Sequence, residues 1–328
     1  MSLLEPQLAP SVEEAQDPRS RSAEAIARLF AIDVPSRVIG VGGHHIQLPG
    51  GHLDVSGLTR WLYGILHAGN EAVFAQASSL PDVDFEDEVR QRVDDVGVLV
   101  PAVVTRDAAG DIEQVEVHRV RLDASSTIVT EGPDRSYVRL PSLRPRLSPG
   151  FFMMVNDRGS FDPALGPLVR YYVGCRDPHE ALDQWATAVA ALQTTRSSFR
   201  TKILSRRAAF PRNDALVFYA QAEDRAVLET LLGVFGETIE GATEGSPLCA
   251  ALSPALRTAD EPFDLRGQPG RSFGEHRCSL MAEAVASSLE SPGDTLAEHL
   301  RRLCLEANVD PDDVARNRDR NKARMGAG

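Results

Sequence analysis

Between about residue 137 and residue 307, short apolar runs of strand length are mixed with longer runs of helical spacing, in no regular order. The strand-length runs cover residues 137–140, 151–155, 168–173, 199–204 and 215–219, and the helical runs cover residues 179–193, 224–235, 279–288 and 294–307. Because strands and helices do not alternate regularly, this pattern predicts an α+β fold. We expect a mixed or antiparallel sheet flanked by helices.

The part of the chain before residue 130 predicts a smaller α+β region. Its apolar spacing predicts a helix over residues 22–32 and another from an N-cap at Ser56 to about residue 67. Residues 97–105 and 112–122 flank a turn and predict a β-hairpin.

Changes in composition divide the chain into four parts. They are a disordered N-terminus (1–20), the N-terminal α+β region (21–130), a second domain (136–308) and a polar tail (309–328), with a boundary near residues 125–135. The acidic segment 82–95 is expected to be a helix or a charged loop, and residues 141–150 a linker rich in proline and arginine.

Composition excludes several classes of protein. The longest apolar stretch without a charge, residues 96–104, is far shorter than the ~20 residues that span a membrane. A net charge of −12 argues against general nucleic-acid binding. The four cysteines are far apart in the sequence, which predicts free thiols in a reducing cytoplasm and no zinc site. We therefore expect a cytoplasmic protein that binds neither nucleic acid nor membrane.

No cofactor motif is present. The sequence has no GxGxxG, no GxxxxGK[ST] and no GxSxG, so dinucleotide, P-loop and nucleophile-elbow chemistry are not predicted. His44, His45 and His52 have no carboxylate at a matching spacing, and a glycine-rich loop that happens to hold histidines explains them better than a metal site. We expect neither a metal nor a cofactor.

Charge is unevenly distributed, and lysine is nearly absent. Residues 137–212 carry twelve Lys/Arg against five Asp/Glu, which suggests either an anionic ligand or a solvated basic face. The chain has two lysines, Lys202 inside this basic segment and Lys322 in the tail. A lysine can act as a base when burial or neighbouring cations lower its pKa, whereas arginine keeps its proton. Lys202 is therefore either a base or a lysine that merely extends into solvent.

Cationic and phenolic residues recur along consecutive predicted strands. They are Arg170 with Tyr172, Arg200 with Lys202, Arg212 with Asp214, Tyr219, and His276 with Arg277, to which Arg139 is added less firmly. Alternation places Arg170 and Tyr172 on one face of a strand, and Arg200 and Lys202 on one face of another. If these strands are neighbours, a phosphate clamp, a base and a phenolic acid converge, and these are the parts needed to eliminate phosphate.

The segment 137–289 resembles the HopA-type effector domain of lyases in class V lanthipeptide and related peptide-modifying pathways. The matching stretches are Ser148-Pro-Gly-Phe-Phe152, Val169-Arg-Tyr-Tyr172, Ser198-Phe-Arg-Thr-Lys-Ile-Leu204, Arg212-Asn-Asp-Ala-Leu-Val-Phe-Tyr219, Ser272-Phe-Gly-Glu-His-Arg-Cys278 and Ala282-Glu283, with a looser match over residues 58–64. The resemblance implies a cytoplasmic lyase that acts after a separate kinase has phosphorylated Ser or Thr in a precursor peptide, leaving dehydroalanine or dehydrobutyrine.

The chain is more distantly similar to bacterial phosphothreonine lyases. By position, the resemblance makes Lys202 the base that takes the α-proton, Arg212 a phosphate-binding arginine and Tyr219 a tyrosine near the site. Where those lyases have Lys-x-His, this chain has Arg170-Tyr171-Tyr172, so the histidine acid is missing. Either Tyr172 or His276 is then expected to protonate the leaving phosphate oxygen, while Arg170, Arg277 and less surely Arg139 help to bind it.

Two other functions fit the same residues. A non-catalytic module could bind a phosphopeptide with the same arginines, and a structural subunit could tether a kinase to its peptide. The expected partners are the leader and core of a phosphorylated precursor peptide, a Ser/Thr kinase and a cyclase. The hairpin edge at residues 115–121 is a candidate for strand addition by the leader.

Overall fold

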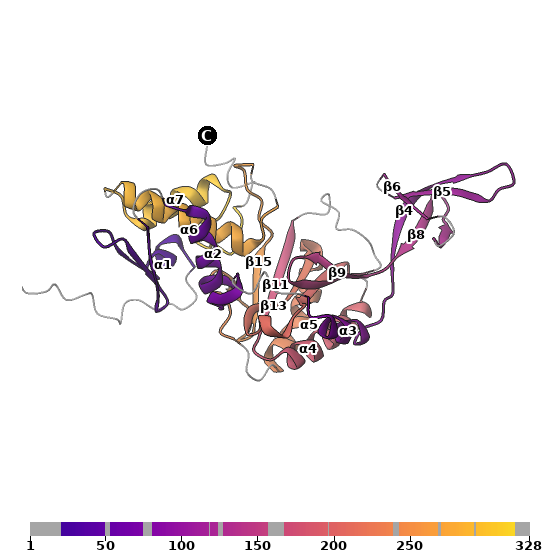
Figure 1. The fold of residues 1–328 in the computed structure, drawn as a ribbon, viewed down its shortest axis with the longest axis horizontal. Coiled ribbons are helices and arrows are strands. Elements are labelled where there is room, and N and C mark those ends of the chain that lie inside the picture. The colour runs from indigo at the N-terminus through magenta and orange to yellow at the C-terminus, as the bar shows by residue number, and fades with distance from the viewer. Residues whose placement is uncertain are drawn as a thin grey trace, which may run out of the picture.

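A seven-stranded antiparallel sheet lies at the centre of the fold, which confirms the expected α+β class (Figure 1). In spatial order its strands are β14 (Ala250–Ala251), β15 (Leu256–Asp260), β11 (Leu168–Cys175), β13 (Arg212–Gln221), β12 (Phe199–Leu204), β10 (Phe151–Val155) and β9 (Leu143–Ser148). β9 replaces part of the expected linker. Its Pro145 is compatible with a strand because β9 is at the edge of the sheet, where a missing N–H breaks no ladder.

This structure is a computed structural model that describes residues 21–49, 53–74, 81–117, 119–123, 127–156, 167–195, 197–238, 243–267, 270–291 and 293–318. The N-terminus that we expected to be disordered, His52, and the tail beyond Arg318 with Lys322 lie outside these ranges.

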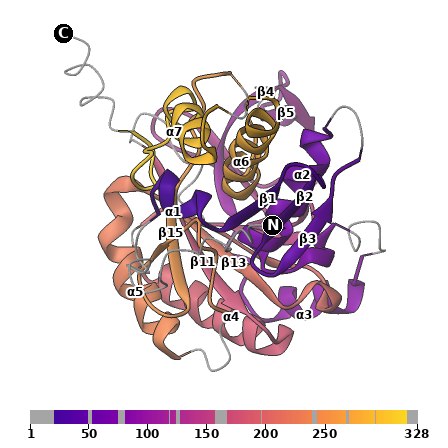
Figure 2. The same ribbon diagram turned by 90° about the vertical axis from the view of Figure 1, so that its left-hand side faces the viewer.

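Helices cover both faces of the central sheet. One face packs against α4 (Pro178–Gln193) and α5 (Arg225–Thr238), and the other lies below α6 (Phe273–Glu290) and α7 (Leu296–Glu306) (Figure 2). Trp185 of α4 donates a hydrogen bond from Nε1 to Thr201 Oγ1 of β12 at 3.0 Å. Because side chains alternate along β12, Thr201 faces α4 while Arg200 and Lys202 face the other way, as the sequence predicted.

The N-terminal elements add to the core of the sheet. They are α1 (Ala23–Ala27), the antiparallel strands β1 (Phe30–Asp33), β2 (Val38–Val41) and β3 (His44–Gln47), α2 (Val55–Leu62) continued by the π-helix η2 (Tyr63–Ala68), the short helix η3 (Glu71–Val73) and α3 (Val83–Gln91). Buried Ile26, Leu58 and Phe85 belong to the same hydrophobic cluster as the central sheet.

Two sequence expectations for this region were wrong in detail. The helix expected over residues 22–32 stops at Ala27, because residues 30–33 pair with β2 and satisfy their backbone groups there. The N-cap of α2 is Asp54 and not Ser56, since the Asp54 carboxylate accepts a hydrogen bond from Gly57 N at 2.9 Å. The acidic segment 82–95 forms α3.

A second sheet of five strands projects from the body (Figure 1). Its order is β6 (Val120–Leu122), β5 (Ile112–Val117), β4 (Val98–Arg106), β8 (Ser136–Leu140) and β7 (Val129–Glu131). The predicted hairpin is the β4–β5 pair, and a turn at Arg119 separates β5 from β6. Val115, Val117 and Val138 form a small core of its own. β8, which we had assigned to the second domain, pairs with β4.

The C-terminal region is more ordered than its composition suggested. α6 begins six residues before the predicted start, at a capping box between Ser272 and Glu275. Residues 309–318, part of the expected polar tail, pack against the body, with Val314 and Ala315 buried. We call this segment the C-terminal strap. The four cysteines are buried free thiols, as expected, and no helix among the described residues is long and apolar enough to cross a membrane.

Candidate active site

A cavity of about 710 Å³ opens on the face of the central sheet that α4 and α5 leave uncovered. Strands β11, β12 and β13 contribute to its lining, together with Tyr63 at the start of η2 and the first turn of α6. The charged residues in the lining are the cations Arg146, Arg170, Lys202, Arg206, Arg212 and Arg271 and the carboxylates Glu86, Glu261 and Glu275. The cavity is therefore cationic, although acidic side chains share it.

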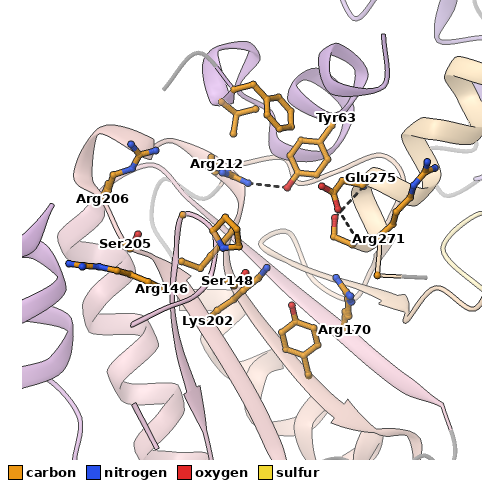
Figure 3. Close-up of a pocket in the computed structure, with 18 of the residues that line it drawn as sticks. Tyr63, Arg146, Ser148, Arg170, Lys202, Ser205, Arg206, Arg212, Arg271 and Glu275 are labelled. Atoms are coloured by element: carbon orange, nitrogen blue, oxygen red, sulfur yellow. Dashed lines mark hydrogen bonds between the residues drawn. The ribbon is translucent and has the colours of Figure 1, made fainter. Parts of the chain in front are cut away.

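Lys202 rises from β12 into this cavity, between Arg212 and Arg170 (Figure 3). Its Nζ lies 3.9 Å from the centre of the Phe151 ring, which is a cation–π contact. Among the described residues, no carboxylate or other hydrogen-bond acceptor is paired with this ammonium. Lys202 is thus a half-buried amine that touches an aromatic face and has its hydrogen-bonding capacity unused.

Arg212 is held in a fixed direction by two partners. Its Nε and Nη2 donate to the two oxygens of Asp214 at 2.7 Å each, and Nη2 also donates to the Tyr63 hydroxyl at 3.1 Å (Figure 3). Tyr63 in turn donates to Asp214 Oδ2 at 3.0 Å. Burial alone would raise the pKa of Asp214, but the adjacent guanidinium holds it well below its ordinary value. Asp214 therefore stays ionised and orients the Arg212 fork, which leaves Nη1 for a ligand.

Strict alternation along β13 would place Arg212 and Tyr219 on opposite faces, yet both line the cavity. The register between β11 and β13 shifts near Arg212. Val173 pairs with Leu216, whereas Cys175 pairs with Arg212, so β13 advances four residues for two of β11. The strand is irregular between these two residues, so alternation counted from Tyr219 does not hold as far as Arg212.

Arg170 is the second oriented guanidinium. It forms a bidentate ion pair with Glu261 through Nε and Nη2. Its Cζ lies 5.0 Å from the centre of the Tyr219 ring, directly across from it on the neighbouring strand. Arg212 and Arg170 are thus each aligned by a carboxylate, with Lys202 between them (Figure 3).

Comparison with protein-family models gives one match, the HopA1 effector protein family, over residues 142–316. The chain belongs to the HopA1 effector protein family. The match includes Arg170, Lys202, Arg212 and Tyr219, whereas Tyr63 and Glu86 lie outside it. In this HopA1-family protein, residues 142–316 therefore supply the sheet strands and most other residues that line the cavity, and the N-terminal elements supply the rest of the lining.

Two solved structures are similar to this HopA1-family chain. One is the effector protein from Pseudomonas syringae pv. tomato strain DC3000, with 16% identity, a TM-score of 0.40 and coverage of 52% of this chain and 63% of that one. The other is the effector protein from Pseudomonas syringae pv. syringae strain 61, with 14% identity, a TM-score of 0.42 and coverage of 81% and 98%. No curated protein matches the chain.

The other predicted site residues do not line the cavity. Tyr172 is buried against the rings of His67 and Phe273, and burial raises the pKa of its phenol well above the ordinary value. Arg200 is on the cavity side of β12 but outside the lining. His276 contacts Asp264, and Arg277 donates to a carbonyl of the strap. Arg139 lies in the five-stranded sheet and donates to the Val96 carbonyl.

Several lining residues were missed by sequence analysis. Tyr63 belongs to the stretch 58–64 that resembles the family loosely. That resemblance was the one sequence feature that could have indicated Tyr63 as a site residue. Arg206 lies in the basic segment and could have been added on charge alone. Glu261, Arg271 and Glu275 come from the loop after β15 and the start of α6, where no periodicity indicates a site.

Two buried histidines make stability depend on pH. Burial lowers the pKa of His67 to about 4, and burial together with the Arg277 cation lowers the pKa of His276 to about 4. The unfolded chain takes up these protons near pH 6.5, which the folded protein does not. Stability should therefore be complete above about pH 6.5 and fall as pH drops toward 4, by up to roughly 3 kcal/mol for each imidazole.

Urea unfolding at neutral pH and in mildly acidic buffer measures this loss. We expect His67→Gln to reduce the pH dependence by about half, because one of the two imidazoles is gone. Stability that rises on acidification, or an unchanged slope in His67→Gln, would contradict the explanation.

Proposed function

We propose that this HopA1-family protein is a phosphoserine/phosphothreonine lyase. It would eliminate phosphate from a kinase-phosphorylated precursor peptide and leave dehydroalanine or dehydrobutyrine, as in lanthipeptide-type biosynthesis. The observation that carries the proposal is the position of Lys202, an amine with no acceptor in the described part of the chain, between two arginines aligned by carboxylates (Figure 3).

In the proposed reaction, the neutral Lys202 amine takes the α-proton of the phosphorylated residue. The C–H electron pair forms the Cα–Cβ double bond, the Cβ–O bond breaks, and phosphate leaves with the electron pair of the Cβ–O bond. Arg212 and Arg170 hold the phosphate through N–H groups that Asp214 and Glu261 do not use. The proton taken from Cα remains on Lys202 until the product departs.

The departing oxygen needs little help once two guanidiniums neutralise it. We assign any proton donation to Tyr219, which lines the cavity beside Arg170. Tyr172 and His276, the two acids considered from sequence, are both nearly inaccessible and lie outside the lining, so we do not assign the step to them.

Mass spectrometry of a phosphorylated Ser/Thr peptide, incubated with and without the protein, tests the function. Loss of H3PO4 from the peptide supports the lyase. Binding of the phosphopeptide without any loss of mass would instead support a non-catalytic phosphopeptide-binding module, the alternative that uses the same arginines. Arg302→Gln, at an exposed position of α7, is a control that removes one positive charge outside the cavity.

Elimination should not require a metal. The charge that a divalent ion would place on the phosphate is already present as guanidinium groups around the cavity. Treatment with EDTA should therefore leave the rate unchanged within about twofold, as measured by phosphate release. A large loss that a divalent cation restores would show that a metal takes part.

The expected partners remain proposals: a Ser/Thr kinase that supplies the phosphorylated residue, a cyclase that consumes the dehydrated product, and a leader peptide that docks on the N-terminal region 21–130. The docking edge needs one correction. Val115 and Val117 belong to β5, which pairs on both sides, so the open edge of the hairpin is β6 at residues 120–122.

Removing the leader should weaken affinity for the precursor, because the leader raises the effective concentration of the core segment near the cavity. A short phosphopeptide at high concentration should still be processed. Titration of full-length and leaderless substrate gives the comparison, and equal affinities would remove the proposed docking.

A further inference from the structure

His276 and Arg277, in the first turns of α6, do not line the cavity. His276 Nε2 is 3.0 Å from Asp264 Oδ2, in the loop that follows β15. Arg277 is almost fully buried and donates from Nε to the Val314 carbonyl of the strap at 2.6 Å. The two neighbouring residues therefore connect the start of α6 to two segments, the loop after β15 and the C-terminal strap.

The strap in turn holds the end of β15. Asp260 N donates to the Ala315 carbonyl at 2.9 Å, and Asn317 N donates to Asp260 Oδ2 at 3.0 Å. The Asn317 side chain lies between two partners. Its Nδ2 donates to the Glu261 carbonyl at 2.7 Å, and its Oδ1 accepts from Arg277 Nη2 at 3.3 Å.

Glu261 is the residue that aligns Arg170. Its N–H donates to the Leu168 carbonyl at 2.9 Å and its C=O accepts from Asn317, so the backbone of Glu261 is held on both sides. Its carboxylate forms the bidentate pair with Arg170. A continuous set of contacts thus runs from Arg277 through Asn317 and Glu261 to a guanidinium that lines the cavity.

We propose that the C-terminal strap is a positioning element of the site, in which Asn317, held by Arg277, fixes Glu261 and so sets the direction of the Arg170 guanidinium. The inference rests on the proposed phosphate chemistry, because it gives Arg170 an anion to bind. A long arginine side chain loses rotamer freedom when it binds a ligand, and a carboxylate that fixes it beforehand reduces that cost.

Asn317→Ala tests this without changing any charge. Substituting Glu261 directly would remove both the alignment of Arg170 and a negative charge near the anion, and these two effects act in opposite directions. The loss of one hydrogen bond to the Glu261 carbonyl should weaken binding of inorganic phosphate by about threefold to tenfold. Asp312→Glu is the control, because it also keeps every charge and Asp312 is an exposed strap residue that contacts Arg301 and not β15.

The decisive measurement is a double-mutant cycle by calorimetric titration of the full-length protein with inorganic phosphate. If Asn317 acts through Arg170, the Asn317→Ala effect should shrink to less than about twofold in an Arg170→Gln background. The same factor in both backgrounds, or no effect in either, overturns the inference. Arg277→Lys offers a second route if Asn317→Ala does not fold, since one ammonium cannot bind both Val314 and Asn317 and phosphate binding should weaken.

Phosphopeptide kinetics separate this inference from the lyase proposal. An effect through Arg170 should raise KM more than it lowers kcat, because Lys202 is untouched. A coupled loss of phosphate binding in a protein that does not eliminate phosphate would support the strap and reject the lyase. Elimination that proceeds without coupling between Asn317 and Arg170 would support the lyase and reject the positioning role of the strap.

Discussion

The Lys202→Arg variant should bind a phosphopeptide and leave it intact, with kcat lower by at least ~10²-fold, the lower range for loss of a general base. Arginine keeps the positive charge and most of the length of the side chain, so attraction for the phosphate remains. It cannot accept a proton, however, because its guanidinium stays protonated in proteins. Mass spectrometry of the peptide and a binding titration measure the two properties separately.

The surroundings of Lys202 make this substitution informative. Its Nζ contacts the Phe151 ring and no carboxylate among the described residues, so the change to arginine breaks no ion pair there. The control Arg302→Gln alters one surface charge on α7 and should keep the native rate. Elimination that persists in Lys202→Arg, with binding intact, would reject Lys202 as the base. Tyr219 would then be the candidate in the lining, since His276 is buried against Asp264.

Sequence periodicity was sufficient for four strands of the central sheet, β10, β11, β12 and β13, because each of them is an apolar run of strand length, but it predicted neither β14 nor β15. It also placed Arg200 and Lys202 together on one face of β12, since strand alternation is a local property, and the structure shows that α4 packs on the other face. Periodicity failed where tertiary contacts decide. Residues 30–33 continue a helical pattern but pair with β2, and β9 resembles a linker because an edge strand tolerates proline and charge.

The same limit applies to the cavity. Arg212 and Tyr219 both line it although they are seven residues apart on β13, which strict alternation would place on opposite faces. Tyr63 reaches it from a different part of the chain, where the α2 helix continues into a π-helix. His276, considered as an acid, and Arg277, considered as a phosphate ligand, belong to the stretch 272–278 that resembles the family, but α6 directs them toward the loop after β15 and the strap. Local sequence identifies residue types, whereas the packing of α6 on the sheet decides which of them face the cavity.

Arg212→Lys should lower kcat/KM by roughly 10- to 100-fold although the charge is kept, since a charge-assisted hydrogen bond contributes about 1.5–3 kcal/mol. The guanidinium contacts Asp214 through two nitrogens and Tyr63 through one of them, and it still presents Nη1 to the cavity. A lysine ammonium has one nitrogen at the end of a flexible chain. It cannot bridge Asp214 and Tyr63 and also bind a phosphate in a fork geometry.

Steady-state kinetics with a phosphopeptide measure the loss, and Arg302→Lys, outside the cavity, is the charge-conserving control. Asp214→Asn provides an independent check, because it leaves the Arg212 guanidinium in place and removes the carboxylate that aligns it. If alignment matters, Asp214→Asn should also reduce kcat/KM, and its effect should not add to that of Arg212→Lys, since both substitutions break the same bidentate pair. Near-native kcat/KM in Arg212→Lys would mean that the phosphate needs a positive charge at this position but not a planar fork, and the binding role would then extend equally to Lys202 and Arg206 in the same lining.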